Sequence, residues 1–478
     1  MRSVVTWLVG CSLFLGAVAL SAADRPNVLF ITVDDMNRDS IGVYGCPIPD
    51  ITPNIDKLAT EGLRFEHAHV TIAICMPTRA VWMTGRYPHR SGALGFDRIN
   101  KDVATLLETL HDAGYHTGIM AKVPHVVPSR GKAWDVVVEA NDLGVGRDPA
   151  KYYQQSKKFF AEVAKSDKPF FLMVNSQDPH RPFANSQQEQ GRLKGKRKDP
   201  KFYTEVSRTF DPQEVPVPGF LPDLPEIRQE LSEYYASVHR ADEIVGSLLK
   251  ALDESGLARN TLVVFTSDHG MPLPFAKTNC WRHSTITPWI VRWPGVVKPD
   301  SIDREHMISG IDYTPTILDA VGLSPLPGVD GRSYLPILKG KSQRNRNYVI
   351  TSINRTSGKN EYPMRCVMTR NASYIFNGWS NGQKVFKNES QAGLTMKAMK
   401  EAAKTDTEIA ARVKHFLYRT PEELYDNDSD PDALHNWAKL SECQGVLNGW
   451  RNLLLKQMIE TDDPVLPAYK TYLESVHK

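Results

Sequence analysis

Residues 28–35 read VLFITVDD, an unbroken apolar and β-branched run that ends in two carboxylates. Such a run has the length and composition of a strand buried on both faces, which is typical of parallel sheets. Residues 261–270 repeat the arrangement, because TLVVFT is followed by SDHG. Ligands of parallel α/β sheets bind beyond the carboxyl ends of the strands. The two acidic strand ends therefore mark the expected position of a functional site.

Further apolar runs alternate with helical patterns up to about Asn345. This alternation predicts an α/β fold with a large, mostly parallel sheet sandwiched by helices. Beyond Asn345 the runs are short and turn signals cluster, which predicts a smaller C-terminal α+β subdomain. We therefore divide the chain into residues 1–23, a domain over 24–344 and a subdomain over 345–478. The expected strands are 28–33, 116–121, 170–174, 261–266 and 289–293, and the expected helices are 103–113, 152–164, 225–252, 315–321 and 443–459.

The first 23 residues have the pattern of a secretory signal peptide. Arg2 precedes an apolar run over 4–20, and small residues follow at 21–23. We expect cleavage near Ala22 or Ala23 and export to the periplasm, the medium or a lysosome-like compartment, without stable membrane insertion. Two alternatives remain open: a membrane anchor, for which the run is short, and a lipoprotein, for which residues 8–11 read LVGC.

The composition argues against several classes of function. The 58 basic and 55 acidic residues give a net charge of +3, without the basic excess of a dedicated nucleic-acid binder. Cys11 lies in the expected signal peptide, and the other five cysteines show no C-x-x-C spacing, so a zinc site is not indicated. The basic stretch 192–201 is expected to be a solvated loop, with steering of a polyanion as the alternative.

The acidic strand ends predict a site for a hard cation. Asp34 and Asp35 follow one expected strand and Asp268 follows another. Carboxylate oxygens are ligands that suit calcium or magnesium. The alternative is that each acidic residue only caps a following helix. One carboxylate alone would favour the cap, whereas the pair of strand ends favours the metal site.

A third motif lies between these strands, where residues 75–86 read CMPTRAVWMTGR. Pro77 fits the first turn of a helix, which places Cys75 at the helix N-terminus, where the helix dipole favours negative charge. A lone cysteine there is more often a small buried thiol. However, Cys75, Pro77, Thr78 and Arg79 match the signature C-x-P-[ST]-R, in order with the acidic strand ends. On these residues the chain resembles the type I sulfatases of the alkaline-phosphatase-like superfamily.

The resemblance implies a catalytic domain over 24–344 and a mechanism. In that family a separate maturation enzyme oxidises the cysteine to formylglycine (3-oxoalanine), whose hydrate attacks sulfur with one hydroxyl and expels sulfate with the other. One divalent cation, expected to be calcium, acidifies the attacking hydroxyl. The resemblance implies the metal ligands Asp34, Asp35, Cys75, Asp268 and His269, the catalytic residues Cys75, Arg79, Lys122, His125 and His180, with His180 as general acid, and the sulfate-binding residue Lys277.

Within that family the chain most resembles the heparan N-sulfatases, on residues 178–181 (DPHR), 270–279 and 362–365 (YPMR). This implies N-sulfoglucosamine residues of heparin or heparan sulfate as substrate, with Asp178 and Arg181 contacting the sugar. Residues 352–360 lack the histidine and glutamate pattern of that branch, so 6-O or 2-O sulfatase activity on glucosamine or iduronate stays an alternative. A phosphate or phosphonate ester hydrolase and an inactive glycan-binding protein are further alternatives, against which the intact motif argues.

Overall fold

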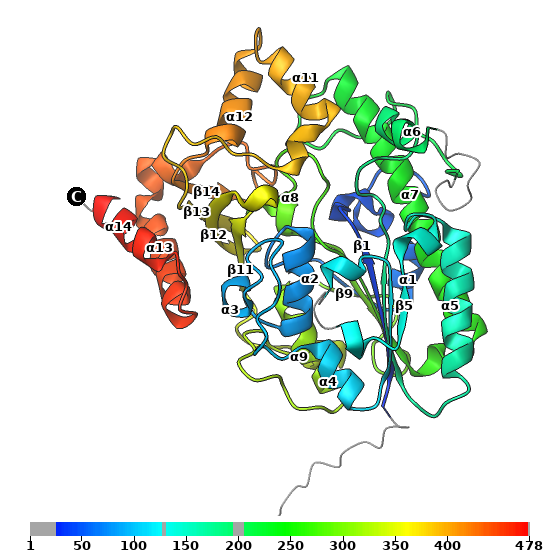
Figure 1. The fold of residues 1–478 in the computed structure, drawn as a ribbon. Coiled ribbons are helices and arrows are strands. Elements are labelled where there is room, and N and C mark those ends of the chain that lie inside the picture. The colour runs from blue at the N-terminus through cyan, green and yellow to red at the C-terminus, as the bar shows by residue number, and fades with distance from the viewer. Residues whose placement is uncertain (1–24, 127–130, 195–204, 477–478) are drawn as a thin grey trace, which may run out of the picture.

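The computed structural model describes residues 25–126, 131–194 and 205–476; the expected signal peptide and most of the basic stretch 192–201 lie outside these residues. The largest of three sheets in the described residues is mostly parallel, as expected (Figure 1), and the smallest pairs only β3 (Ala68–His69) with β10 (Ile308–Ser309). Strand β8 reverses the direction, since it pairs antiparallel with both of its neighbours. The strand order is β5 (Val136–Val138), β4 (His116–Met120), β6 (Phe170–Asn175), β1 (Asn27–Val33), β7 (Thr261–Ser267), β8 (Trp289–Arg292), β2 (Leu63–Phe65) and β9 (Ser301–Asp303).

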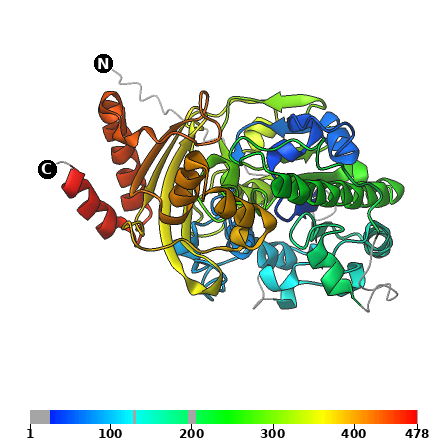
Figure 2. The same cartoon turned by 90° about the horizontal axis from the view of Figure 1, so that it is seen from above.

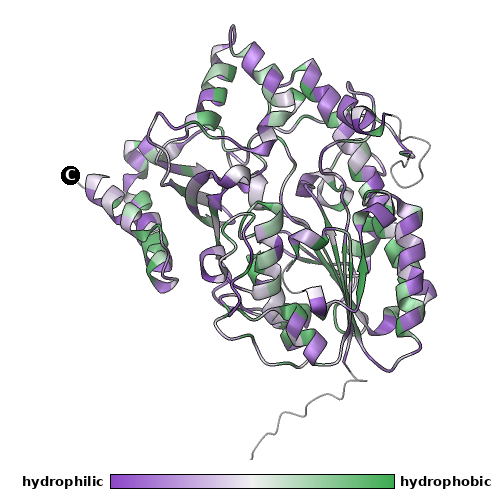
Figure 3. Ribbon diagram, in the orientation of Figure 1, coloured by the Kyte–Doolittle hydropathy of each residue, from purple (hydrophilic) through white to green (hydrophobic). Residues whose placement is uncertain are grey.

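The five expected strands are confirmed, and each observed end differs from the expected one by no more than one residue. Side chains of β1 alternate between two cores: Leu29 and Ile31 lie in one, and Val28 and Phe30 lie in the other. Phe30 packs edge-on against Trp82 with ring centroids 5.1 Å apart. Burial on both faces explains why the strand is apolar throughout; Figure 3 shows these central strands as the hydrophobic interior of the unit.

Helices cover both faces of this sheet (Figure 1). The helix that begins at Pro149 starts three residues earlier than expected, because the Asp148 side chain accepts hydrogen bonds from the backbone N–H groups of Ala150 and Lys151. No helix in the described part of the chain is both long and apolar enough to cross a membrane. One face carries α1 (Pro53–Thr60), α5 (Pro149–Val163) and α7 (Pro225–Glu254), and the other carries α2 (Cys75–Thr84), α4 (Leu106–Asp112) and α9 (Tyr313–Ala320).

The four-stranded sheet is antiparallel and belongs to the smaller C-terminal unit, as the short runs of sequence predict. Its strands are β11 (Tyr348–Arg355), β12 (Glu361–Thr369), β13 (Ala372–Asn377) and β14 (Glu422–Asp426). Cys366 and Ile375 face a core shared with the first unit, whereas Val367 and Tyr374 face a separate core. Figure 2 shows the sheet between two pairs of helices, α11 (Leu394–Ala402) with α12 (Thr407–Tyr418), and α13 (Gln444–Glu460) with α14 (Leu466–Val476).

A buried ion pair of the C-terminal unit lies at its contact with the first unit and carries a stability prediction. Arg419 donates from Nε and Nη2 to Glu423 at 2.7 Å, and both side chains are fully buried. Trp281 of the first unit donates to Glu423 Oε2 at 3.1 Å. Replacing Glu423 with alanine leaves a buried guanidinium without its anion, so we expect the free energy of unfolding in urea to fall by about 3–5 kcal/mol.

The control for this prediction is Glu460→Ala. Glu460 lies 3.7 Å from Lys456, and the two side chains are 51% and 67% exposed. Loss of an exposed pair changes stability by less than about 1 kcal/mol. Equal effects of the Glu423 and Glu460 substitutions would contradict the role assigned to the buried pair.

Candidate active site

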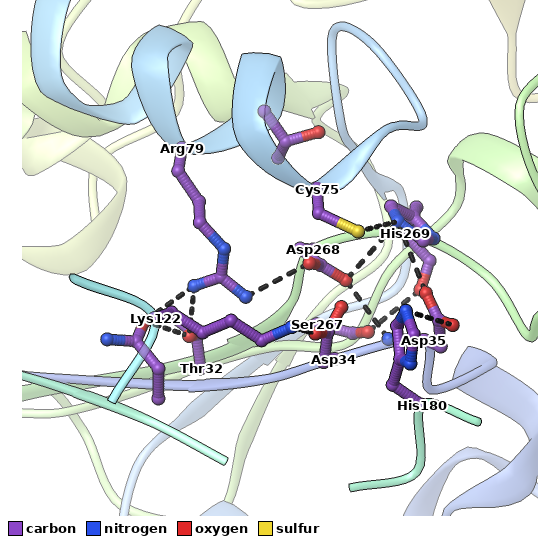
Figure 4. Close-up of polar contacts among 12 residues, drawn as sticks. Thr32, Asp34, Asp35, Cys75, Arg79, Lys122, His180, Ser267, Asp268 and His269 are labelled. Atoms are coloured by element: carbon purple, nitrogen blue, oxygen red, sulfur yellow. Dashed lines mark hydrogen bonds and ion pairs between the residues drawn. The ribbon is translucent and has the colours of Figure 1, made fainter. Parts of the chain in front are cut away.

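The acidic strand ends lie side by side, as expected from the sequence (Figure 4). Strands β1 and β7 pair in parallel with Val33 opposite Ser267, so Asp34 and Asp268 leave the sheet together. The backbone N–H of Asp35 donates to Asp268 Oδ1 at 3.0 Å. All three carboxylates are fully buried. Buried carboxylates at such close range require cations to offset their mutual repulsion.

Cys75 is the first residue of α2, which confirms the expected position at a helix N-terminus. Its Sγ lies 3.5 Å from His269 Nε2 and points at the carboxylates. Burial, which outweighs the opposing effect of Lys277, raises the pKa of the Cys75 thiol well above its usual value. An unmodified thiol here is therefore protonated and a poor nucleophile.

The residues around Cys75 fit a hard cation. Asp34, Cys75, Asp268 and His269 each offer one ligand atom, and these atoms all lie within 4.8 Å of one another. Ligands at about 2.3–2.6 Å from a calcium ion can be separated by up to twice that distance. In addition, Asp34 Oδ1 and Asp35 Oδ1 are buried and accept no hydrogen bond, which is costly unless a cation contacts them.

His269 has the protonation state of a metal ligand. Its Nδ1 lies 3.0 Å from the carbonyl oxygen of Gly270, and since a carbonyl only accepts, Nδ1 carries the proton. The lone pair of Nε2 then faces the cluster, 3.3 Å from Asp35 Oδ1. Burial lowers the pKa of His269 to about 4, so the ring is neutral near pH 7. A backbone carbonyl that accepts the proton of the other ring nitrogen commonly orients metal-bound histidines.

Three basic side chains surround the carboxylates, one on each. Arg79 donates to Asp268 Oδ2 at 3.0 Å, Lys277 donates to Asp35 Oδ2 at 2.9 Å, and Lys122 Nζ contacts Asp34 Oδ2. Burial lowers the pKa of Lys122 to about 7. Burial also raises the pKa of Asp35 to about 8, against the effect of Lys277. Arg79, Lys277 and the protonated form of Lys122 therefore place positive charge around the carboxylates that lie near the Cys75 side chain.

His180 lies at the edge of the cluster beside a residue that the sequence did not indicate. Its Nδ1 lies 2.6 Å from the carbonyl oxygen of Arg181, and its Nε2 lies 3.2 Å from Glu389 Oε1. Glu389 also accepts from Lys277 at 2.9 Å through Oε2. Glu389 belongs to the C-terminal unit and stands in a loop-like stretch, residues 387–393 (KNESQAG). Neither a strand end nor a motif marks it, so only the packing of the two units identifies it.

Three expected site residues, Asp178, Arg181 and His125, have side-chain partners other than Cys75, Asp268 and His269. Asp178 is fully buried and accepts from Arg240 Nε at 2.5 Å. Arg181 donates to Glu230 Oε1 at 2.7 Å, and contact with a sugar would require Asp178 and Arg181 to exchange these internal partners. The ring of His125 packs edge-on against Phe96, with centroids 5.8 Å apart. The proposed roles of these three residues, like those of the other expected site residues, stay predictions.

Comparison with known proteins identifies the protein class. Residues 26–323 match the family model described as Sulfatase. The chain belongs to the sulfatase family. It is therefore a hydrolase of sulfate esters or sulfamates, and the family resemblance based on the motif at residues 75–79 is confirmed.

Two relatives and one solved structure show the range of similar sulfatases. Human N-sulphoglucosamine sulphohydrolase is 31% identical, over 97% of this chain and 96% of the relative. An N-acetylglucosamine-6-O-sulfatase of Bacteroides thetaiotaomicron is 25% identical, over 67% of this chain and 72% of the relative. A structure described as a complex with its substrate D-glucosamine-2-N,6-O-disulfate has a TM-score of 0.68 and 19% identity, over 92% of this chain and 99% of that chain. The last likeness concerns the fold alone, which is the alkaline-phosphatase-like α/β fold expected from the sequence.

Proposed function

We propose that this sulfatase removes sulfate from N-sulfoglucosamine residues of heparin or heparan sulfate, using formylglycine at position 75 and one calcium ion. The cluster of Cys75, Asp34, Asp268 and His269, four ligand atoms within 4.8 Å of one another, carries the proposal for the chemistry. The substrate rests on the similarity to human N-sulphoglucosamine sulphohydrolase over nearly the full length of both chains. An exported chain and a separate maturation enzyme that oxidises Cys75 belong to the same proposal.

The chain's own residues supply most of the catalytic environment. When bound by Asp34, Asp35, Asp268 and His269, a calcium ion supplies Lewis acidity for the attacking hydroxyl and for a sulfate oxygen. Lys122 contacts Asp34 and Lys277 contacts Asp35, so both ammonium groups lie beside the proposed sulfate position. Fixed cations in a buried site stabilise negative charge that grows on the sulfate oxygens in the transition state.

His180 is placed to protonate the departing group. The carbonyl of Arg181 fixes the Nδ1 proton and therefore the orientation of the ring. Burial and the nearby Lys277 lower the pKa of His180 well below its usual value, so in the proposal the ring takes up its second proton, on Nε2, when the anionic substrate binds beside it. As the S–N bond breaks, its electron pair passes to nitrogen, which takes the Nε2 proton, while a hydroxyl of residue 75 gives up its proton to a carboxylate of the cluster and forms the new S–O bond through its oxygen.

A second substrate class has support of its own. The relative from Bacteroides thetaiotaomicron is an N-acetylglucosamine-6-O-sulfatase, and protonation by His180 serves a leaving oxygen as well as a leaving nitrogen. We therefore keep 6-O-sulfated glucosamine as the alternative substrate.

A panel of defined saccharides tests the proposed substrate. Purified protein, co-expressed with a formylglycine-generating enzyme and supplied with calcium, is incubated with N-sulfated, 6-O-sulfated and 2-O-sulfated glucosamine and iduronate saccharides. We expect inorganic sulfate from the N-sulfated glucosamine, with kcat/KM at least about a hundredfold above that for the O-sulfated members. Release from 6-O or 2-O positions alone would overturn the N-sulfo assignment, whereas a 4-nitrophenyl phosphate control reports any phosphate ester hydrolysis.

A further inference from the structure

Glu389 is the one acidic side chain that the C-terminal unit adds to the contacts described for this site. Its side chain is 37% exposed, whereas Lys277 is 2% exposed and His180 is 20% exposed. The Asn388 side chain donates to the backbone carbonyl of Lys277 at 3.1 Å, which fastens this segment to the first unit. Glu389 therefore stands on the open side of the cluster, held in place by its neighbour in sequence.

The position of Glu389 is unfavourable for binding an anion. A sulfo group brought to Lys277 meets the Glu389 carboxylate, which already occupies Lys277 Nζ at 2.9 Å. Like charges at this range repel. A carboxylate in a sulfate-binding site therefore needs a compensating interaction with another part of the substrate.

The leaving group offers that compensation when it is an amine. Glu389 Oε1 lies 3.2 Å from His180 Nε2, the atom assigned to protonate the leaving atom. The carboxylate is therefore within about two hydrogen-bond lengths of the leaving atom. Nitrogen is more basic than an ester oxygen, so proton transfer from His180 Nε2 runs ahead of S–N cleavage and places positive charge on nitrogen in the transition state. The electron pair of the breaking S–N bond then neutralises that charge, and the free amine takes up one more proton from water near neutral pH. A leaving oxygen stops at the neutral hydroxyl. A carboxylate stabilises the positive charge that develops on nitrogen and gives oxygen no such advantage.

We propose that Glu389 is a specificity-determining residue that favours N-sulfo over O-sulfo leaving groups. This inference rests on the proposed function and assigns the preference to one carboxylate of the C-terminal unit. It also explains why that unit contributes to chemistry that is otherwise carried by the first unit.

The test compares two substrates in wild-type protein, Glu389→Gln and Glu389→Asp. The substrates are N-sulfoglucosamine and 4-nitrophenyl sulfate, an O-sulfate whose leaving group carries no positive charge. We expect Glu389→Gln to lower the ratio of the two kcat/KM values at least about tenfold, mainly through N-sulfoglucosamine, and Glu389→Asp to restore part of it. The control is Glu401→Gln, which removes a charge of the same subdomain that pairs with Lys404 and is 73% exposed; its ratio should equal that of wild type.

Product inhibition provides a second readout that does not depend on which substrate is used. Glucosamine, a cation, should inhibit Glu389→Gln at least about tenfold less strongly than wild type, whereas inhibition by neutral N-acetylglucosamine should not change. Equal losses for both substrates and both inhibitors would overturn the inference and leave Glu389 a general positioning residue. Wild-type protein that is inert toward N-sulfoglucosamine but releases 6-O-sulfate would instead refute the proposed function, while the inhibition assay would still decide the role of Glu389.

Discussion

Replacing Cys75 with serine is expected to lower kcat/KM for sulfate release by roughly a thousandfold or more, with the thermal unfolding midpoint unchanged. A serine hydroxyl can attack sulfur, but it lacks the second oxygen on the same carbon that expels sulfate and regenerates the aldehyde. The sulfated enzyme then accumulates, so the residual reaction should be at most a single turnover. Steady-state kinetics with an initial burst measurement, together with intact mass, checks both parts of the prediction.

The matched control is Cys443→Ser. Cys443 is a partly buried free thiol of the C-terminal unit. It packs against the separate core that Val367 and Tyr374 face, away from the Cys75 cluster. Its replacement should leave kcat/KM within about twofold of wild type, because surface-near substitutions outside the site change little. Multiple turnovers by the Cys75 variant would mean that residue 75 does not need two geminal oxygens.

Replacing Asp268 with asparagine is expected to weaken calcium binding and, with it, the calcium-dependent gain in both activity and stability. Asp268 gives one oxygen to the proposed ion and accepts from Arg79 through the other. Asparagine keeps the shape but removes the charge, so calcium affinity should fall by about tenfold to a hundredfold or more. We expect kcat/KM to fall at least as far at calcium concentrations that saturate wild type.

Thermal unfolding provides a readout of this site that is independent of turnover. Chelator-treated wild-type protein should gain about 2.7 kcal/mol when calcium reaches a hundred times its dissociation constant, because the ion relieves repulsion among Asp34, Asp35 and Asp268. At the same calcium concentration, the asparagine variant should gain only about 0.4–1.4 kcal/mol. Asp167→Asn, a change at an exposed position, serves as the control and should respond like wild type. An identical calcium response in all three proteins would contradict the ligand assignment.

The sequence predicts the central sheet and its site well because burial on both faces leaves a strong local signal. Residues 28–33 and 261–266 are apolar throughout, and the observed strands follow these bounds within one residue. The parallel pairing of β1 and β7 then places Asp34 and Asp268 together. The motif at residue 75 supplies the third element, since Pro77 and the observed start of α2 at Cys75 agree.

The parts that the sequence does not predict depend on packing between distant segments. Glu389 reaches Lys277 and His180 only because the C-terminal unit packs on the first, and a loop glutamate gives no signal of that contact. The ion pair between Asp178 and Arg240 leaves a weak signal in the sequence, because Arg240 lies among the buried residues of α7. A charged residue at such a position requires a buried counter-ion. This requirement would have indicated an ion pair for Asp178 in addition to the expected sugar contact.

The measurement that tests the central claim most directly is the mass of the peptide containing residue 75, taken from protein that is turning over substrate. We expect formylglycine or its hydrate at that position, with specific activity proportional to the modified fraction. An unmodified Cys75 thiol in protein of undiminished turnover would contradict it.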